Sequence, residues 1–236
     1  MSSFPRPRAT RSAGTSAVAY PGALLALAAC AGHAAPVATR PTVVPAARVE
    51  VPGVGAPAVA AGAAAVSEED LAYLRERELL VPVAGARAAR VAGSFDDDRS
   101  GGRVHHATDI LAPRGTPVLA ADDGRVWKVR WNALGGNTIY AVDPLERFVY
   151  YYAHLDRYRD GLAEGAAVQK GDTLGYVGTT GNAPPDVPHL HFQAARLGAD
   201  RRYWAGTPVD VLPFLRAADA ARAARAASAA ALTSAR

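Results

Sequence analysis

GRVWKVRWNALGGNTIYAVDPLERFVYYY, residues 124–152, contains three runs of β-branched and aromatic side chains that are separated by short turns. The runs are Gly124–Arg130, Thr138–Val142 and Phe148–Tyr152, and Gly, Asp and Asn residues bound them. Short strands with no helical pattern between them indicate antiparallel pairing, because parallel strands need long crossover connections. This stretch therefore predicts an antiparallel β-sheet or sandwich.

The same pattern continues on both sides of this stretch. Thr116–Leu119 precedes it, and Thr173–Gly178 and Leu190–Ala194 follow it, each bounded by turn residues. Several short strands at regular spacing are typical of all-β domains. We therefore expect one compact, mainly β domain at residues 83–215, with an antiparallel sheet or sandwich as its fold.

Helical patterns flank this β region. A short helix is predicted over 67–82, because Ser67 is a good N-cap, acidic residues follow it, and an apolar stripe runs through Leu71–Leu79. We expect this helix to pack on the side of the domain. Residues 216–236 are mainly Ala and Arg without an apolar stripe, so a frayed helix or a disordered tail is expected there.

The N-terminal residues have the pattern of an export signal. Residues 1–30 hold three early arginines, then an apolar stretch that ends in Leu-Ala-Ala before Cys30. This order is typical of a secretory signal and resembles the lipobox of bacterial lipoproteins, in which the cysteine is acylated. An uncleaved membrane anchor is the alternative, because the apolar character continues to about Val37. Either way, we expect the chain to be exported.

Residues 31–66 are almost wholly Ala, Pro, Val and Gly, without a usable period. Such a segment cannot bury enough surface to offset the entropy of ordering it, so we interpret it as a tether. Neutral sequence drift in a low-complexity segment explains this composition equally well. Together, the anchor and the tether predict a lipoprotein of the cell envelope that faces the periplasm or the cell wall.

The charge distribution argues against nucleic-acid binding. The 236 residues carry 26 basic and 22 acidic side chains, a net charge of +4. Five of the arginines and none of the acids precede Glu50, so from Glu50 onward 21 basic side chains stand against 22 acidic ones. A nearly neutral domain lacks the basic patch that phosphate backbones require. The single cysteine also excludes an internal disulfide framework and a thiolate-rich zinc cluster.

Five of the six histidines lie between residues 105 and 191. His189 and His191 are two apart on a predicted strand and therefore share a face, while His105 and Asp109 are four apart in a loop that enters a strand. Two imidazoles and one carboxylate form a three-ligand zinc set with a fourth position open for water. Iron(II) in a non-haem site accepts the same ligand types, so both metals fit the residues.

Each of these signals also has an ordinary explanation. Many strands carry a His-x-His pair on their surface, and His154 alone could be a surface residue at the end of a strand. We expect His106 to have only a structural role. It is the neighbour of His105 in sequence, and its side chain should therefore point in the opposite direction. The combination of His189 and His191 with His105 and Asp109 makes coincidence a poor explanation.

The order of the motifs resembles the lysostaphin/LytM-type zinc endopeptidases, which cut the peptide crosslinks of bacterial peptidoglycan. The resemblance runs from about Ser94 to Phe192. Its elements are Arg99-Ser100-Gly101-Gly102-Arg103 before His105 and Asp109, Ala112-Pro113-Arg114-Gly115-Thr116-Pro117-Val118, Asp123-Gly124-Arg125-Val126, Gly135-Gly136-Asn137, Tyr152-Ala153-His154-Leu155, Gly171-Asp172-Thr173-Leu174-Gly175, Gly178-Thr179-Thr180-Gly181 and His189-Leu190-His191-Phe192. The fold that it implies, a compact β domain with a groove, agrees with the strand pattern.

The resemblance implies one zinc ion per chain, with His105, Asp109 and His191 as its ligands. It also implies that His154 and His189 are the uncoordinated catalytic pair, without deciding which of them is the base. Two departures from the family pattern concern the groove. Ala107 stands where the family usually has glycine, and the loop over residues 182–188 is longer than in many relatives.

The function expected from these residues is a zinc endopeptidase of peptidoglycan peptides. The histidine pair must supply the acid-base chemistry, because Glu146 and Glu164 lie outside the motifs. A non-catalytic relative that binds or activates another wall hydrolase is the alternative, although such relatives typically lose zinc ligands and this chain keeps all five positions. An iron oxygenase does not fit the surrounding glycine and proline framework. The oligomeric state stays open.

Overall fold

The computed structural model describes residues 65–99 and 102–234 of the chain. Cys30, the predicted export signal and almost all of the predicted tether therefore lie outside the described residues. Among the helices that are described, none combines the length and the apolar character that a membrane crossing requires.

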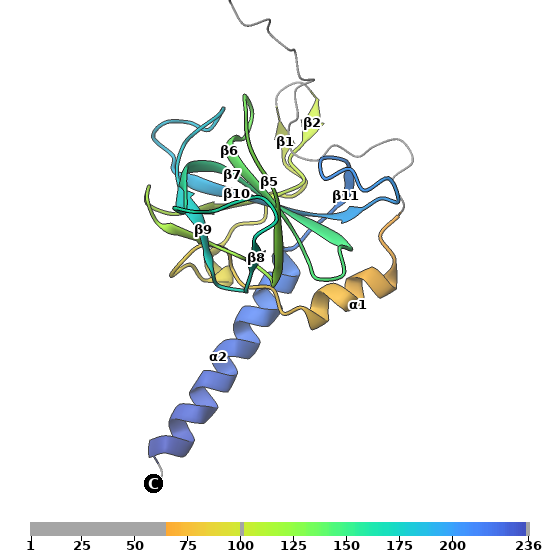
Figure 1. The fold of residues 1–236 in the computed structure, drawn as a ribbon. Helices are drawn as coiled ribbons and strands as arrows, with labels where there is room; N and C mark the ends of the chain where they lie inside the picture. Colours follow the sequence, from red (N-terminus) through yellow and green to blue (C-terminus); the bar gives the residue numbers. More distant parts are fainter. Residues whose placement is uncertain (1–64, 100–101, 235–236) are drawn as a thin grey trace, which may run out of the picture. The chain divides into compact units, whose positions relative to one another are not determined.

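The described elements follow one another in the order shown in Figure 1. The helices and the 3₁₀ helix are α1 (Glu68–Glu76), η1 (Ala88–Arg90) and α2 (Leu212–Ser234). The strands are β1 (Asp98–Arg99), β2 (Arg103–Val104), β3 (Thr108–Leu111), β4 (Pro117–Leu119), β5 (Gly124–Asn132), β6 (Gly136–Val142), β7 (Phe148–Tyr158), β8 (Ala167–Val168), β9 (Thr173–Val177), β10 (His189–Leu197) and β11 (Gly206–Val209).

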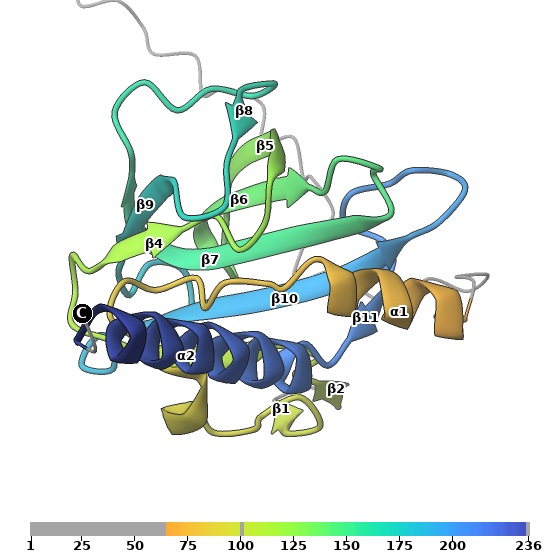
Figure 2. The ribbon, with the colours of Figure 1, turned by 90° about the horizontal axis from the view of Figure 1, so that it is seen from below.

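The predicted mainly β, antiparallel fold is confirmed. Strands β11, β10, β7, β6, β5 and β8 are neighbours in that order, β3 pairs with β10, and β9 pairs with β4 and β7. Every strand pair described is antiparallel. The long strands β7 and β10 run side by side through the middle of this sheet (Figure 2). They carry most of the residues of the site described below.

Strand β7 is buried on both faces, which explains its unbroken run of apolar and aromatic residues. Tyr150 and Tyr152 point into the main core, whereas Tyr151 and Ala153 belong to a second cluster on the opposite face. Strand β10 follows the same alternation, with Leu190 and Phe192 in the main core. The histidines on either side of Leu190 consequently lie on the face away from the main core.

Helix α1 begins as the sequence predicts and ends earlier. The Ser67 side chain accepts a hydrogen bond from the Asp70 main chain, and the Asp70 carboxylate accepts one from the Ser67 main-chain N–H, which forms a capping box. The helix ends at Glu76 instead of continuing toward residue 82. The chain turns at Glu78, which has a positive φ of 44°. Leu79 is therefore buried in the core from an extended segment rather than from a helix.

Helix α2 begins at Leu212, four residues before the predicted tail, and its first turns are docked. Leu212 and Leu215 are buried in the main core. Farther along, the Arg222 guanidinium donates to the main-chain carbonyls of Glu78 and Leu79 at 2.9 and 3.0 Å. The structure therefore has a helix over the predicted tail as far as Ser234, and hydrogen bonds from arginine guanidinium groups to main-chain oxygens hold its first half where the apolar stripe is missing.

Candidate metal site and the groove around it

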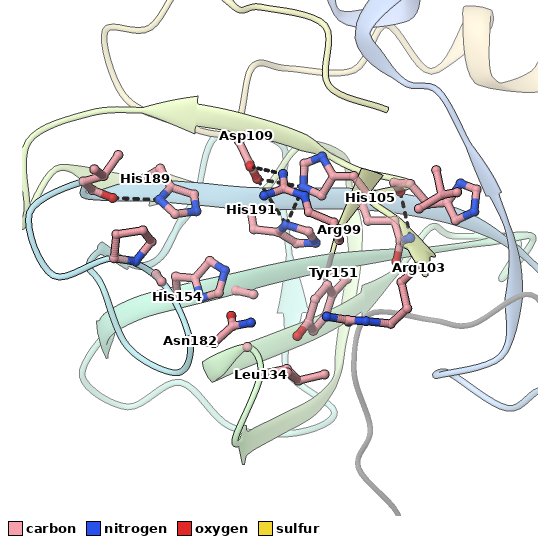
Figure 3. Close-up of a pocket in the computed structure, with 18 of the residues that line it drawn as sticks. Arg99, Arg103, His105, Asp109, Leu134, Tyr151, His154, Asn182, His189 and His191 are labelled. Atoms are coloured by element: carbon pink, nitrogen blue, oxygen red, sulfur yellow. Dashed lines mark hydrogen bonds and ion pairs between the residues drawn. The ribbon is translucent and has the colours of Figure 1, made fainter. Parts of the chain in front are cut away.

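The pairing of β3 with β10 brings two candidate ligands together from positions 82 residues apart. In the register of these strands, Asp109 lies directly opposite His191. The Asp109 Oδ1 atom and the His191 Nδ1 atom are 3.1 Å apart. Figure 3 shows both side chains on the same side of the sheet, turned toward His105.

His105 reaches the same point from the loop between β2 and β3. Its Nδ1 atom lies 2.7 Å from the main-chain oxygen of Ser94, and its Nε2 atom lies 3.1 Å from Asp109 Oδ1 and 3.0 Å from His191 Nδ1. The ring is almost fully buried. Because a carbonyl oxygen only accepts, His105 carries its proton on Nδ1 and directs a lone pair at the other two groups.

The three side chains fit a divalent cation. Their ligand atoms lie within 4.8 Å of one another and form a candidate metal group. Tetrahedral zinc with ligand distances of about 2.0 Å sets its ligand atoms about 3.3 Å apart, close to the 3.0–3.1 Å found here. Two imidazole lone pairs and a carboxylate converge on one point, and a cation between them satisfies all three.

The carboxylate of Asp109 is held in its ionised form. Burial by itself raises the pKa of Asp109, but His105 and His191 hydrogen-bond and attract the carboxylate when their rings are protonated, and this outweighs burial and brings the pKa of Asp109 well below its ordinary value. The second carboxylate oxygen, Oδ2, accepts a hydrogen bond of 2.7 Å from Arg99 Nη2. Asp109 therefore presents one oxygen to the two histidines and the other to a guanidinium.

His154 and His189 lie beside this group without belonging to it (Figure 3). The centroid of the His154 ring is 4.9 Å from that of His189 and 5.7 Å from that of His191. The Nδ1 atoms of His154 and His189 each lie 2.8 Å from a main-chain oxygen, those of Thr180 and Val187. Burial lowers the pKa of His154 to about 4, against the opposing effect of its bond to Thr180.

His154 stands in an unusual backbone conformation. Its φ is +61°, in the left-handed region that side chains other than glycine seldom adopt. Its main-chain N–H donates to the Gly135 oxygen at 2.7 Å, at a register irregularity between β6 and β7. The strand is therefore distorted where it delivers this side chain to the site, as is common for functional residues.

Two glycine motifs hold this distorted strand end. A Cβ atom on Gly136, whose φ is +64°, would lie 2.4 Å from the Thr180 carbonyl carbon, so the two loops touch through their main chains. Thr180 Oγ1 accepts a hydrogen bond from Asn137 N at 3.0 Å and donates one to the Leu155 oxygen at 2.7 Å. The Gly-Gly-Asn and Gly-Thr-Thr-Gly motifs thus form one support behind His154.

An open groove of about 590 Å³ runs over the five residues. Arg99, Arg103 and Val104 of the β1–β2 hairpin line one end, and Leu134 and Gly135 line another wall. The loop that the sequence marks as long contributes Asn182, Ala183, Pro184 and Val187. Within the described residues, Asp109 is the only acidic side chain that lines the groove, so no glutamate is available for acid-base chemistry.

The remaining sequence expectations have mixed outcomes. His106 lies outside the metal group, as expected, although it lines the groove and has a φ of +53°. Ala107 is buried in an ordinary backbone conformation, so the position does not require the family's glycine. The sequence reasoning assigned no role to Tyr151 and Gln193, which also line the groove. The alternation along β10, which puts Gln193 on the face of His191, could have identified Gln193.

Residues 103–210 match the model of peptidase family M23. The L-Ala–D-Glu endopeptidase of Bacillus subtilis (strain 168) is 34% identical over 122 residues, which are 50% of this chain and 36% of that protein. The peptidoglycan DD-endopeptidase ShyC of Vibrio cholerae is 37% identical over 91 residues, which are 39% of this chain and 20% of that protein.

Among solved structures, the antimicrobial peptidase lysostaphin from Staphylococcus simulans aligns with a TM-score of 0.48 and 25% identity, over 60% of this chain and 54% of that chain. The matches to the two endopeptidases span only 36% and 20% of their lengths. The matched segment of this chain contains all five histidine and aspartate positions described above. Residues 103–210 are therefore a domain of peptidase family M23, and the resemblance to lysostaphin/LytM-type endopeptidases is confirmed.

Proposed function

We propose that this chain is a zinc-dependent endopeptidase that hydrolyses peptide crosslinks of bacterial peptidoglycan. The observation that carries the proposal is the convergence of His105, Asp109 and His191 at 3.0–3.1 Å on the floor of an open groove, with two further histidines beside them. The name of one relative, a peptidoglycan DD-endopeptidase, supports peptidoglycan as the substrate. One zinc ion per chain follows from the single metal group among the described residues.

In this proposal His105, Asp109 and His191 hold the metal through Nε2, Oδ1 and Nδ1. When bound, zinc would polarise a carbonyl oxygen and lower the pKa of water to about 7. Three protein ligands would suit a catalytic zinc site, in which one further position is free for water or substrate, whereas structural zinc sites usually have four protein ligands. Arg99 keeps Asp109 oriented by occupying its second oxygen.

His154 and His189 share the acid and base roles. Each has Nδ1 bound to a main-chain oxygen, so each is protonated at Nδ1 and directs Nε2 away from that bond. A neutral Nε2 can accept a proton from water, and a protonated one can stabilise an oxyanion or donate to the leaving amine. The main-chain bonds fix both rings in the tautomer that these roles require.

The test is release of soluble fragments from purified peptidoglycan sacculi by the zinc-loaded protein, followed by mass spectrometry. We expect cleaved crosslink peptides from the wild type. His191→Ala should lose both zinc and activity, whereas His154→Ala should keep zinc and lose about two or more orders of magnitude in turnover. His106→Ala is the matched control, because it removes a neighbouring imidazole outside both sets and should leave both quantities nearly unchanged.

Two results would contradict the proposal. A wild-type protein that binds sacculi and zinc but releases no fragments would instead favour a binding or activator module. Full activity of His154→Ala and His189→Ala, with zinc retained, would show that the pair performs no acid-base chemistry.

A further inference from the structure

Three of the four histidines in the site have one ring nitrogen fixed by a main-chain carbonyl. These bonds are His105 Nδ1 to Ser94 at 2.7 Å, His154 Nδ1 to Thr180 at 2.8 Å and His189 Nδ1 to Val187 at 2.8 Å. Each bond fixes both the tautomer and the direction of its ring. Histidines that bind metals nearly always have such a partner on the nitrogen that does not face the metal.

His191 is the exception, and its ring is turned the other way. Its Nδ1 atom faces His105 and Asp109, while its Nε2 atom is buried and has no hydrogen-bond partner. When the Nδ1 lone pair faces a cation, the ring proton must reside on Nε2. The ring then has a buried donor without an acceptor, which is unfavourable.

Gln193 carries the complementary unpaired group. It lies two residues beyond His191 on the same face of β10 and is 1% exposed. Its Nε2 atom donates to the His106 oxygen at 2.8 Å, and because that carbonyl only accepts, the orientation of the amide is determined. Its Oε1 atom is consequently a buried acceptor, and it has no partner.

Tyr151 is another polar side chain near this point, and its buried hydroxyl also has no hydrogen-bond partner. Tyr151 is opposite Gln193 in the register of β7 and β10, and its ring meets that of His191 edge-on. Its Oη atom lies against Gly135, since a Cβ atom placed on Gly135 would be 2.0 Å from it. The tyrosine therefore packs beside His191, and Gln193 remains the acceptor on the same strand.

We propose that Gln193 is a positioning residue that holds His191 in its metal-binding tautomer. Gln193 Oε1 accepts the hydrogen bond of His191 Nε2–H and so directs the Nδ1 lone pair toward His105 and Asp109. Neither atom has a partner in the present structure, so the bond closes by a side-chain rotation or through one bridging water. The proposal rests on the zinc site of the proposed function.

Two variants separate this role from a merely structural one. Gln193→Leu removes the acceptor and also the donor to the His106 oxygen. Gln193→Glu keeps acceptor oxygens, loses the donor and adds a negative charge. If Gln193 positions His191, zinc affinity should fall about 10- to 100-fold in Gln193→Leu and by less than about threefold in Gln193→Glu. Support of the His106 loop alone predicts equal losses in both variants.

Thr138→Val is the matched control. Thr138 is fully buried, and its hydroxyl donates to the Arg130 oxygen at 3.0 Å, away from the metal group. The substitution removes a buried hydrogen bond at nearly constant volume, so the melting temperature should fall while zinc affinity stays unchanged. This control shows that a loss of stability does not by itself weaken zinc binding.

The measurements are zinc affinity by competition with a chromogenic chelator and the imidazole ¹H–¹⁵N spectrum. In the zinc-loaded wild type and in Gln193→Glu, the His191 Nε2–H proton should exchange slowly, and in Gln193→Leu it should exchange too fast to observe. Wild-type zinc binding that Gln193→Leu leaves unchanged, or equal losses in both variants, would overturn this inference alone. Failure of the wild type to bind zinc would overturn the proposed function and this inference with it.

Discussion

At the scale of single residues, the site depends on which ring nitrogen each histidine presents. His105, His154 and His189 present Nε2 because main-chain oxygens bind their Nδ1 atoms. His191 presents Nδ1, because it projects from the strand directly opposite Asp109. The orientation of these rings is therefore set by the backbone as much as by the side chains, and a substitution that moves one of these carbonyls would act like the loss of the histidine that it holds.

His154 allows a residue-scale prediction about strain. In the left-handed region a residue with a Cβ atom is destabilised by roughly 1–2 kcal/mol, whereas glycine is not. His154, at a φ of +61°, carries this strain in the native protein. We therefore expect His154→Gly to be more stable than His154→Ala by about 1 kcal/mol, measured by urea unfolding of the metal-free protein.

The neighbouring Ala153 supplies the control for that prediction, because its φ is negative, as in an ordinary strand. Ala153→Gly should destabilise the protein by roughly 0.5–1 kcal/mol, the usual direction for glycine in a strand. Both His154 variants should be inactive. A His154→Ala protein as stable as His154→Gly would show that the strand end relaxes when the imidazole is removed, and that the native conformation is imposed by the imidazole.

At the scale of elements, α1 is attached to the sheet by a buried carboxylate. Asp70 accepts hydrogen bonds from the Ser67 main chain at 3.2 Å and from Arg196 Nε, on β10, at 2.7 Å. Burial raises the pKa of Asp70, but the bonds to Ser67 and Arg196 outweigh it and the net pKa is lowered below 3.8. The ionised form of Asp70 therefore stabilises the folded protein.

This lowered pKa predicts a pH-dependent effect of Asp70→Asn. The stabilisation is fully present above the ordinary pKa of 3.8 and is lost as the pH falls through the lower folded value. At pH 7 we expect the variant to be destabilised by about 1–2 kcal/mol, the size of a lost cap and a charged hydrogen bond. Urea unfolding of both proteins should show this difference shrinking below about pH 4.

Glu69→Gln is the control in the same helical turn. The Glu69 side chain is mostly exposed and pairs with Arg147 at the surface. Exposed ion pairs contribute little to stability, so this variant should differ from the wild type far less than Asp70→Asn at pH 7. A difference between Asp70→Asn and the wild type that stays constant from pH 7 to pH 3 would show that the ionisation of Asp70 is not what stabilises the helix.

The strands were predictable from the sequence, whereas the ends and the packing of the helices were not. Runs such as Phe148–Tyr152 predicted strands because branched and aromatic side chains suit a sheet that is buried on both faces. The end of α1 and the docking of α2 were not predictable in the same way. Helix α1 ends before a turn at Glu78, which has a positive φ. Helix α2 docks through hydrogen bonds from Arg222 to main-chain oxygens, and such contacts produce no apolar period in the sequence.

The features of the candidate site were also predictable only in part. His105, Asp109 and His191 were identifiable from their types, their spacing and the motif order, and the structure brings them together. The strained backbone of His154 and the unpaired amide oxygen of Gln193 depend on which strands pair with each other. Strand pairing cannot be inferred from a single sequence. The grouping of these three residues was therefore predictable, whereas the contacts that orient the side chains of the site were not.

At the scale of the whole molecule, the location of the protein is proposed to depend on Cys30, which lies outside the described residues. The domain carries its site within residues 103–210, far along the chain from this cysteine. Cys30→Ser should therefore abolish lipid attachment while the activity of the purified protein stays unchanged. Metabolic labelling with a fatty-acid analogue in a bacterial host measures the first effect, and undiminished label in Cys30→Ser would contradict the lipoprotein interpretation.

The metal should also act on the stability of the whole domain. The candidate ligands join β3, β10 and the loop between β2 and β3, so a bound cation would tie together segments that are far apart in sequence. A ligand that binds only the folded state stabilises it by about 2.7 kcal/mol when its free concentration is 100 times its Kd. For a domain of this size, that corresponds to a rise in Tm of roughly 5–10 °C.

We therefore expect the Tm to rise steadily with buffered free zinc and to return to its starting value on chelation. His191→Ala should lose this dependence, and His154→Ala should retain it, because His154 is outside the metal group. The comparison is informative because both variants remove one imidazole from the same groove, so a general loss of packing would lower both Tm values alike. Only ligand loss makes the Tm of one variant independent of zinc. A zinc-dependent Tm in His191→Ala, or a zinc-independent one in the wild type, would contradict the assignment of the ligands.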